Sequence, residues 1–379
     1  FPWSQRRAHV GDSSTCPQVK IGVRRVAATV ARGGRGSAPS TIMREVSQRE
    51  RLVISKDTPL RTAVVGVGYL GRFHAQKYAQ LSDSQLVAVV DANPDTAAKV
   101  AAELGVEALV NYRELIGRVD AVSLAVPTPL HHRIGCELLE HGIHVLVEKP
   151  IATTVAEAQQ LIATAKRRGC VLQVGHLERF NPAVVAAVRQ LKAPRFIESH
   201  RLAPFKQRGS DVSVVLDLMI HDIDLIQELV GTPIVSIDAI GASVFSGEID
   251  IVNARLKFEG GCVANTTASR ISLKQERKIR IFQDDAYLSI DMQQKILSVI
   301  RKKDAGDIVE SPAQVSIEEE ALEGDALRDE IAAFLTAVRT GSAPVVSGED
   351  GLRALETAMR ITELVRGSVA GRGLGVGAG

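Results

Sequence analysis

Cysteine is scarce in this chain of 379 residues, and its four cysteines are scattered: Cys16, Cys136, Cys170 and Cys262. None of them has the C-x-x-C spacing typical of zinc sites, and so sparse a set does not make a disulfide framework. We therefore expect buried or incidental thiols, a reducing compartment such as the cytoplasm, and no metal site.

Long apolar runs and an excess of positive charge are also missing from most of the chain. No apolar run approaches the roughly 20 residues that a membrane-spanning helix needs. Residues 1–58 hold 11 of the 46 Lys and Arg but 4 of the 44 Asp and Glu, so the remaining residues have a net charge of −5. Without a basic stripe, we expect neither nucleic acid nor a membrane as a partner.

The two ends of the chain lack the patterns of a packed domain. Residues 1–42 begin with Phe, are nearly free of acids, and lack the apolar core of a secretory signal. A transit peptide is one interpretation, and a start at Met43 after upstream, non-native sequence is the one we favour. We expect residues 1–58 to be disordered or non-native and the glycine-rich residues 367–379 to be disordered.

The most informative pattern is a glycine-rich turn after an apolar strand, Gly66-Val67-Gly68-Tyr69-Leu70-Gly71. Gly66 permits a tight turn, Gly68 removes a Cβ that would block a pyrophosphate, and Gly71 lets the following helix pack closely. The N–H groups and partial positive charge of the helix N-terminus suit phosphate. This turn predicts a dinucleotide site that includes Tyr69 and Leu70.

An acidic residue, Asp91, follows a second apolar run at residues 86–90, twenty residues after Gly71. A carboxylate there can accept hydrogen bonds from both ribose hydroxyls and would repel a 2′-phosphate. The sequence therefore favours NAD over NADP.

Residues 59–175 alternate short β-branched strands with helices, which predicts an α/β domain with a doubly wound parallel sheet. Helix start and stop signals include the N-cap Asn93 before Pro94, the capping box Thr154-x-x-Glu157, and glycines at the ends. The expected helices are 72–81, 94–104, 130–141 and 155–168, and the expected later strands are 86–90, 120–126, 144–147 and 171–175.

Residues 176–366 read differently, as strands joined by turns. Two antiparallel hairpins are expected, 251–258 with 262–269 and 278–282 with 287–290. Helices are expected at 214–229, 319–339 and 349–366. We predict a second, α+β domain with a largely antiparallel open sheet.

Glu148-Lys149-Pro150 directly follows the strand 144–147. Open α/β sheets bind ligands outside the carboxyl ends of their strands, and proline fixes the backbone just after the lysine. These residues are candidates for the crevice, although Glu-Lys is also a common surface pair.

Asp217-x-x-x-His221 lies inside the predicted helix 214–229. A spacing of four places both side chains on one helical face, so the carboxylate can orient the imidazole and raise its basicity. His221 is a candidate general base, with Asp222 or Asp224 as alternative orienting groups. A helix-surface or interface histidine is the alternative interpretation.

A stiff loop, Pro127-Thr128-Pro129-Leu130-His131-His132, follows the strand 120–126. Pro127, Thr128 and His131 would lie at the cofactor edge, unless this is an ordinary proline-rich loop. The adjacent histidines have no Cys or carboxylate cluster to complete a metal site.

Together, the glycine turn, Glu148-Lys149-Pro150 and Asp217-x-x-x-His221 resemble the Gfo/Idh/MocA oxidoreductase family over about residues 60–366. The resemblance implies an N-terminal Rossmann domain, a C-terminal domain whose sheet mediates homo-oligomers (dimers or tetramers), and NAD(P)-linked chemistry on a sugar or cyclitol. It gives Lys149, Asp217 and His221 catalytic roles, with Lys149 or His221 as the base. Leu218-Met219-Ile220 departs from members with glycine there.

A narrower resemblance, carried by residues 174–182, 201–205 and 217–224, is to the UDP-N-acetylglucosamine 3-dehydrogenase branch. It implies oxidation of a nucleotide-sugar 3-hydroxyl in lipid A synthesis, followed by a partner aminotransferase. The candidate substrate-binding residues are Lys149, His176, Arg179, Asn181, Lys206 and Arg208, of which Arg179, Lys206 and Arg208 suit a diphosphate unless they only solvate the surface. The alternatives are a cyclitol or simple sugar dehydrogenase and a non-catalytic dinucleotide-responsive binding protein.

Overall fold

The computed structural model describes residues 58–206, 212–303 and 314–372. The expectations for residues 1–57, for Arg208 and for residues 373–379 therefore lie outside the described residues.

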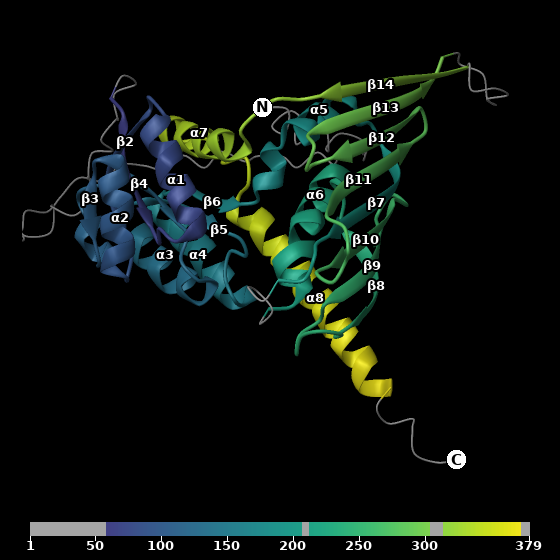
Figure 1. Cartoon of the computed structure of the whole chain (residues 1–379), viewed down its shortest axis with the longest axis horizontal. Helices are drawn as coiled ribbons and strands as arrows, with labels where there is room; N and C mark the ends of the chain where they lie inside the picture. Colours follow the sequence, from purple (N-terminus) through teal and green to yellow (C-terminus); the bar gives the residue numbers. More distant parts are fainter. Residues whose placement is uncertain (1–57, 207–211, 304–313, 373–379) are drawn as a thin grey trace, which may run out of the picture. The chain divides into compact units, whose positions relative to one another are not determined.

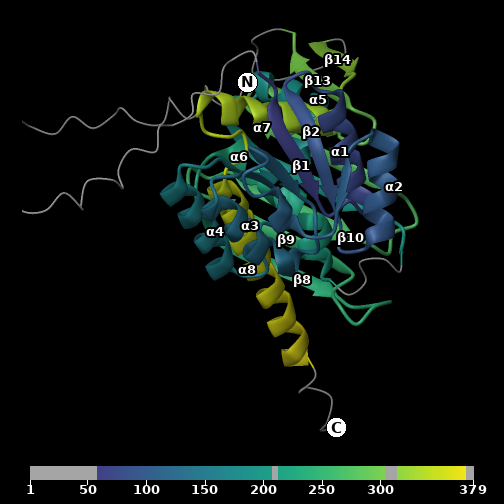
Figure 2. The ribbon, with the colours of Figure 1, turned by 90° about the vertical axis from the view of Figure 1, so that its left-hand side faces the viewer.

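The first sheet is parallel, has six strands in the order β3-β2-β1-β4-β5-β6, and is the doubly wound sheet that the sequence predicts. Helices α1 and α2 lie on one side of it, and α3 and α4 on the other (Figure 2). Its strands are β1 (Leu60–Val65), β2 (Ser84–Val90), β3 (Glu107–Leu109), β4 (Ala121–Leu124), β5 (His144–Glu148) and β6 (Leu172–Gly175). The helices are α1 (Tyr69–Gln80), α2 (Pro94–Leu104), α3 (His131–Glu140) and α4 (Val155–Arg168), with short 3₁₀ turns at Tyr112–Leu115 and Thr128–Leu130.

Local signals set the ends of these helices. Asn93 accepts hydrogen bonds from the first turn of α2, and both hydrogen bonds of the Thr154–Glu157 capping box are present in α4. Gly105 and Gly169 end α2 and α4 in the left-handed conformation, which glycine adopts without steric cost.

The second sheet has eight strands in the order β14-β13-β12-β11-β7-β10-β9-β8. All its pairs are antiparallel except β7 with β10, and both predicted hairpins are present as β9 with β10 and β11 with β12. Its strands are β7 (Pro194–Leu202), β8 (Ile234–Ala242), β9 (Ile251–Phe258), β10 (Val263–Ser269), β11 (Glu276–Gln283), β12 (Ala286–Asp291), β13 (Ile296–Lys302) and β14 (Val315–Ala321).

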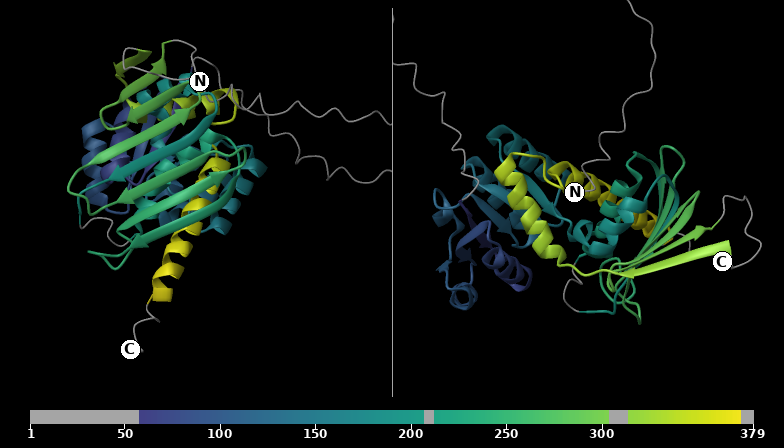
Figure 3. Two further views of the ribbon diagram at one scale, coloured as in Figure 1. Left: turned by 90° about the vertical axis from the view of Figure 1, so that its right-hand side faces the viewer. Right: turned by 90° about the horizontal axis from the view of Figure 1, so that it is seen from above.

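Helices cover one face of this second sheet (Figure 1). They are α5 (Pro182–Gln190), α6 (Ile220–Val230) and α8 (Gly348–Arg372), with a 3₁₀ turn at Leu177–Phe180 before α5. Figure 3 shows the opposite face, where none of the described helices packs. The fold is therefore a Rossmann-type parallel sheet followed by a mostly antiparallel sheet with one open face.

Two predicted helix boundaries are wrong, and a third predicted helix has the expected start but contains an unpredicted π-helical turn. Residues 319–321 belong to β14, and the helix begins later, as α7 (Ala326–Thr340), where Asp325 accepts a hydrogen bond from the backbone N–H of Arg328. Helix α8 continues to Arg372, into the tail expected to be disordered. The helix predicted from residue 214 starts as a π-helical turn, Val215–Met219, before α6.

The C-terminal helices return to the first sheet. The two domains predicted on either side of residue 176 therefore contact each other. Helix α7 packs on α1, and Lys77 forms an ion pair with Asp325 at 2.7 Å. Helix α8 contacts both α4 and β8. These contacts fix the two sheets relative to each other within residues 59–372.

Three further findings concern the described ranges alone. None of their helices is long and apolar enough to cross a membrane. They contain no group of three or more His, Cys, Asp or Glu residues arranged to hold a metal ion. Cys136, Cys170 and Cys262 are free thiols.

Candidate active site

The glycine turn has the geometry of a phosphate cradle. A Cβ at Gly71 would lie 1.8 Å from the carbonyl oxygen of Gly66, and Gly66 itself has a φ of +85°. A Cβ on Gly68, by contrast, would meet nothing within 4 Å, so open space adjoins the start of α1. That helix has no side-chain N-cap, and Tyr69 and Leu70 are exposed at its first turn. These residues fit a dinucleotide pyrophosphate.

Asp91 lies at the carboxyl end of β2, next to this turn. Its carboxylate accepts hydrogen bonds from the backbone N–H groups of Val67 at 2.9 Å and Asn93 at 3.0 Å. The acid is thus fixed against the glycine turn, where a cofactor ribose would lie.

The three candidate residues of the proline-rich loop after β4 differ in burial. His131 is buried, and its two ring nitrogens lie 2.9 Å from the carbonyl oxygen of Val126 and 3.0 Å from that of Pro150. Its ring therefore joins two loops, and the place expected for it at the cofactor edge stays a prediction. Pro127 is exposed and Thr128 is half-buried at the same strand end.

Glu148, at the end of β5, contacts a residue that the sequence reasoning missed. Its Oε1 lies 2.9 Å from Nε2 of His74, on α1, and its Oε2 accepts a hydrogen bond from the backbone N–H of Lys149 at 3.2 Å. Burial alone would raise the pKa of Glu148, but the hydrogen bond from His74 and the charge of Lys149 hold it below its usual value. His74 stands three residues after Gly71, and that spacing is the one signal that could have drawn attention to it.

Lys149 connects the two halves of the molecule. Its Nζ donates a hydrogen bond to the backbone carbonyl of Asp217 at 2.7 Å and lies 3.6 Å from the Asp217 carboxylate. Burial lowers the pKa of Lys149, and the charges of Asp217 and Glu148 oppose this effect only in part. The following peptide bond, to Pro150, is cis.

His221 is half-buried at the first turn of α6. Its Nδ1 has no hydrogen-bond partner within the described part of the chain. Burial and the charges of Lys149 and Arg201 lower the pKa of His221 well below its usual value. The imidazole is therefore neutral near pH 7 and able to accept a proton.

The expected pairing of Asp217 with His221 is absent from the described contacts. Asp217 lies in the π-helical turn and its carboxylate pairs with Lys149. The alternative orienting groups are also engaged elsewhere, because Asp222 pairs with Arg201 at 2.7 Å and Asp224 with Arg179 at 2.6 Å.

Two residues expected to bind substrate have structural partners instead. Arg179 is 1% exposed and pairs with Asp224 and Glu228, so its guanidinium is not available to a diphosphate. Asn181 caps α5 and donates a hydrogen bond to the carbonyl of Met292 at 2.8 Å. These contacts favour roles in the packing of this domain for both residues, and their binding of substrate stays a prediction.

The other two described candidates for substrate binding differ from each other. His176 is buried, and neither of its ring nitrogens has a hydrogen-bond partner in residues 58–206, 212–303 or 314–372. Its Nδ1 lies 3.9 Å from the carboxylate of Asp224. Lys206 is exposed, just beyond β7.

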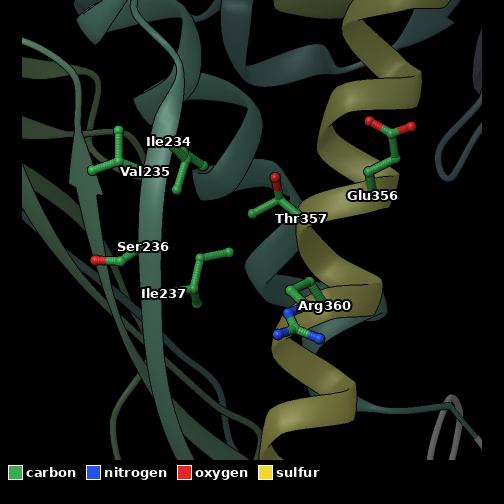
Figure 4. Close-up of a pocket in the computed structure, with 7 residues that line it drawn as sticks. All are labelled: Ile234, Val235, Ser236, Ile237, Glu356, Thr357 and Arg360. Carbon is green, nitrogen blue, oxygen red and sulfur yellow. The ribbon is translucent and has the colours of Figure 1, made fainter.

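A hollow of about 510 Å³ lies elsewhere, between β8 and α8 (Figure 4). None of the candidate residues above lines it. Its lining consists of Ile234, Val235, Ser236, Ile237, Glu356, Thr357 and Arg360. The candidate site therefore comprises the strand ends of the first sheet and the start of α6.

Two family models match this chain. The model described as an oxidoreductase family with an NAD-binding Rossmann fold matches residues 60–176, and the one for its C-terminal alpha/beta domain matches residues 197–369. The chain belongs to the Gfo/Idh/MocA oxidoreductase family. This membership confirms an oxidoreductase with an NAD-binding domain, as the three motifs predict.

Known relatives extend this finding. A UDP-N-acetylglucosamine 3-dehydrogenase from Acidithiobacillus ferrooxidans is 40% identical over 80% of this chain and 96% of its own length. A solved structure of that enzyme aligns with a TM-score of 0.77 and 39% identity, over 82% of this chain and 98% of the other. A scyllo-inositol 2-dehydrogenase (NAD(+)) from Bacillus subtilis is 26% identical over 81% of this chain and 94% of its own.

Proposed function

We propose that this family member uses NAD to oxidise a sugar hydroxyl to a ketone, and that the hydroxyl is the 3-hydroxyl of UDP-N-acetylglucosamine. The substrate assignment is supported by 40% identity to an enzyme named for that reaction, against 26% to the inositol enzyme. Similarity at this level over 80% of this chain favours a shared substrate class, although a fold alone would not.

One observation carries the chemical part of the proposal. The ammonium of Lys149, at the end of a strand of the first sheet, meets the Asp217 turn of the second half, and its charge acts on the neutral His221, four residues after Asp217. A cation and a neutral base at the edge of a dinucleotide cradle are the two groups that alcohol oxidation requires.

His221 would take the hydroxyl proton on its imidazole. Lys149, held by Asp217, would stabilise the negative charge that develops on the same oxygen, an effect worth roughly 3 kcal/mol in a water-excluded site. A bound nicotinamide supplies the hydride acceptor. The exchanged assignment, with Lys149 as base, fits the same contacts because burial lowers the pKa of Lys149.

NAD in place of NADP is proposed from Asp91. Its carboxylate is fixed beside the glycine turn and carries no paired cation among the described residues. A 2′-phosphate there would meet an uncompensated negative charge.

The open face of the second sheet supports a homo-oligomer, as a dimer or tetramer. On β11 the fully buried Ile279 and Ile281 alternate with the exposed Phe282, which stacks on Tyr287 at 4.8 Å. Exposed apolar side chains on a bare sheet face are typical of subunit contacts. Light scattering of the purified chain measures this directly. A partner aminotransferase and a cytoplasmic location stay predictions of the family resemblance.

A substrate panel tests the function. Purified protein with NAD is expected to form NADH with UDP-N-acetylglucosamine at least about tenfold faster, in kcat/KM, than with myo-inositol, scyllo-inositol or free hexoses. The inositol relatives make a cyclitol dehydrogenase the second candidate, and a faster rate with a cyclitol would establish it. Tight NADH binding without turnover of any sugar would favour the non-catalytic binding protein.

A further inference from the structure

His74 is a buried polar residue to which the proposed function gives no role. It lies on α1, the helix that begins at the glycine turn, and it is 2% exposed. Its Nδ1 lies 3.0 Å from Oγ of Ser123 on β4, and that Oγ lies 3.0 Å from the hydroxyl of Tyr78. On its other side Nε2 contacts Glu148 at 2.9 Å. Four side chains thus form one hydrogen-bonded chain that ends next to Lys149.

The Glu148 carboxylate determines which atom is the donor in each hydrogen bond of these four side chains. An ionised carboxylate only accepts, so Nε2 of His74 must carry a proton. The Nδ1 of a neutral imidazole then accepts the Ser123 hydroxyl proton, and Ser123 accepts that of Tyr78. Each member is satisfied when Glu148 is an anion and His74 is neutral. The order serine, histidine, carboxylate matches a hydrolase triad, but Ser123 is fully buried, which excludes a nucleophilic role.

The Glu148 end of this hydrogen-bonded chain contacts Lys149. The second oxygen of Glu148 accepts a hydrogen bond from the backbone N–H of Lys149. The neighbouring strand leaves room for this carboxylate at a glycine, because a Cβ on Gly175 would lie 3.2 Å from its Oε2. The carboxylate is consequently held in one place from three elements, α1, β5 and β6.

We propose that His74 is a positioning residue: it fixes Glu148 as an anion at the end of β5, where Glu148 accepts the backbone N–H of Lys149 and its negative charge favours the ammonium form of the lysine. This inference rests on the proposed function for what Lys149 then does. His74 thereby connects α1, the helix that begins at the glycine turn, to Lys149 through Glu148.

Several other groups act on the same two residues. Around Lys149, Asp217 stabilises the positive charge, and Arg201, His176 and His221 interact with it from the second half of the molecule. Around Glu148, the other titratable groups are His131 on α3 and the buried Glu330 on α7. None of these groups changes in the variants below, so a difference between variants reports on the link from His74 to Glu148.

Two amide variants separate this link from mere packing. His74→Gln places an amide donor near the position of Nε2 and keeps the hydrogen bond to Glu148, whereas His74→Asn reaches only the position of Nδ1 and loses it. Without its donor, the buried Glu148 has a higher pKa and tends to be neutral, and Lys149 loses an attractive charge, so the pKa of Lys149 falls.

The readout is the titration of Lys149 itself. Competitive acetylation with acetic anhydride, followed at the Lys149 peptide by mass spectrometry, gives its midpoint without any need for turnover. We expect the midpoint in His74→Asn to fall by about 0.5 pH unit or more, and the one in His74→Gln to stay within about 0.2 unit of the wild type. The kcat with UDP-N-acetylglucosamine should fall about tenfold in His74→Asn and recover in His74→Gln.

His144 supplies the matched control, because it is a half-buried histidine at the other end of β5, where its Nδ1 accepts the N–H of Val171. His144→Asn should lower the melting temperature and leave the Lys149 midpoint unchanged. An equal shift in His144→Asn, or no shift in His74→Asn, overturns the inference. If His74→Asn does not fold, Glu148→Gln must lower the Lys149 midpoint, and an unchanged midpoint there also overturns it. A shifted midpoint in a protein that oxidises no sugar refutes the proposed function alone.

Discussion

Two buried arginines, Arg179 and Arg201, and the half-buried Lys149 are held by their neighbours in two different ways. Arg179 forms two hydrogen bonds to Asp224, at 2.7 and 2.6 Å, and an ion pair with Glu228, while Arg201 pairs with Asp222 and Glu178. Lys149 has one backbone carbonyl and one carboxylate at 3.6 Å, on a residue whose side chain is 42% exposed.

The electrostatic result is opposite in the two regions. Burial would lower the pKa of each arginine, but the paired carboxylates raise it above its usual value. At Lys149 burial prevails and the pKa falls. Complete compensation makes a cation a fixed part of the structure, whereas incomplete compensation leaves it responsive to a ligand that brings its own negative charge. This contrast supports the proposed chemical role of Lys149 and favours a packing role for the two arginines.

The sharpest test removes the under-compensated cation. Lys149→Met should lower kcat by about 10³-fold or more, because the developing alkoxide loses its charge partner. The affinity for NADH should stay within about threefold and the melting temperature within about 2 °C, since no buried carboxylate is left unpaired. Turnover assays, NADH fluorescence titration and calorimetry measure the three quantities. Unchanged turnover would mean that Lys149 takes no part in the mechanism. The contrast with the arginines would then have no chemical meaning.

The matched test at a compensated cation should give the reverse pattern. Arg179→Met strands Asp224 and Glu228 in a buried site and should cost about 3–5 kcal/mol of unfolding free energy. Urea denaturation of the two variants side by side provides the measurement. A stable Arg179→Met protein with weakened binding of the nucleotide sugar would instead restore the diphosphate role expected from the sequence.

A buried acid whose carboxylate has no hydrogen-bond partner among the described residues extends the contrast to negative charge. Glu330 on α7 is 1% exposed, and neither of its oxygens has a hydrogen-bond partner in the described structure. Burial, together with the charge of Glu148, raises the pKa of Glu330 well above its usual value. The folded protein therefore keeps a proton that the unfolded chain loses above about pH 4.5, and stability falls as pH rises from there to the folded-state pKa.

Glu330→Gln should remove that pH-dependent cost. The variant should be more stable than the wild type by about 1.4 kcal/mol for each pH unit above about 4.5, up to the folded-state pKa. Urea midpoints at about pH 5 and about pH 8 measure the gain, which should be larger at the higher pH. A gain of the same size at both values would show that Glu330 does not carry the extra proton.

The smallest effect is expected at Asp91, an anion compensated only by two neutral N–H groups. Asp91→Ala should reduce the preference for NAD over NADP by about tenfold, because the ribose loses an acceptor and the 2′-phosphate loses a repelling charge. The ratio of kcat/KM for the two cofactors measures it. A ratio equal to that of the wild type would mean that the ribose lies elsewhere.

The parts of the fold that depend on neighbouring residues were predictable from the sequence. The glycine turn, the N-cap Asn93 and the Thr154–Glu157 box act within a few residues, and each of them appears where the pattern places it. The helix predicted at the position of strand β14 was wrong because the prediction used only local sequence. Glu318, Glu319 and Glu320 favour a helix locally, but they lie on the edge strand of a sheet, where charge protects the open edge.

The candidate site was predictable as a set of residues but not as a set of contacts. The approach of Lys149 to Asp217 spans 68 residues of sequence, and the pair of Arg179 with Asp224 spans 45. No local pattern shows that one of these cations is neutralised by two carboxylates and the other by a single, half-exposed one. His74 was missed because its role depends on the side-by-side packing of α1, β4 and β5.

The π-helical turn at Val215–Met219 has a consequence for how this enzyme can change. A π turn carries about one residue more than an α turn, and each residue of a helix turns the chain by about 100°. Removing that extra residue would swing Asp217 away from the lysine and realign it with the face of His221. A one-residue deletion, with no exchange of any chemical group, would thus decide which of the two side chains, Lys149 or His221, the carboxylate contacts.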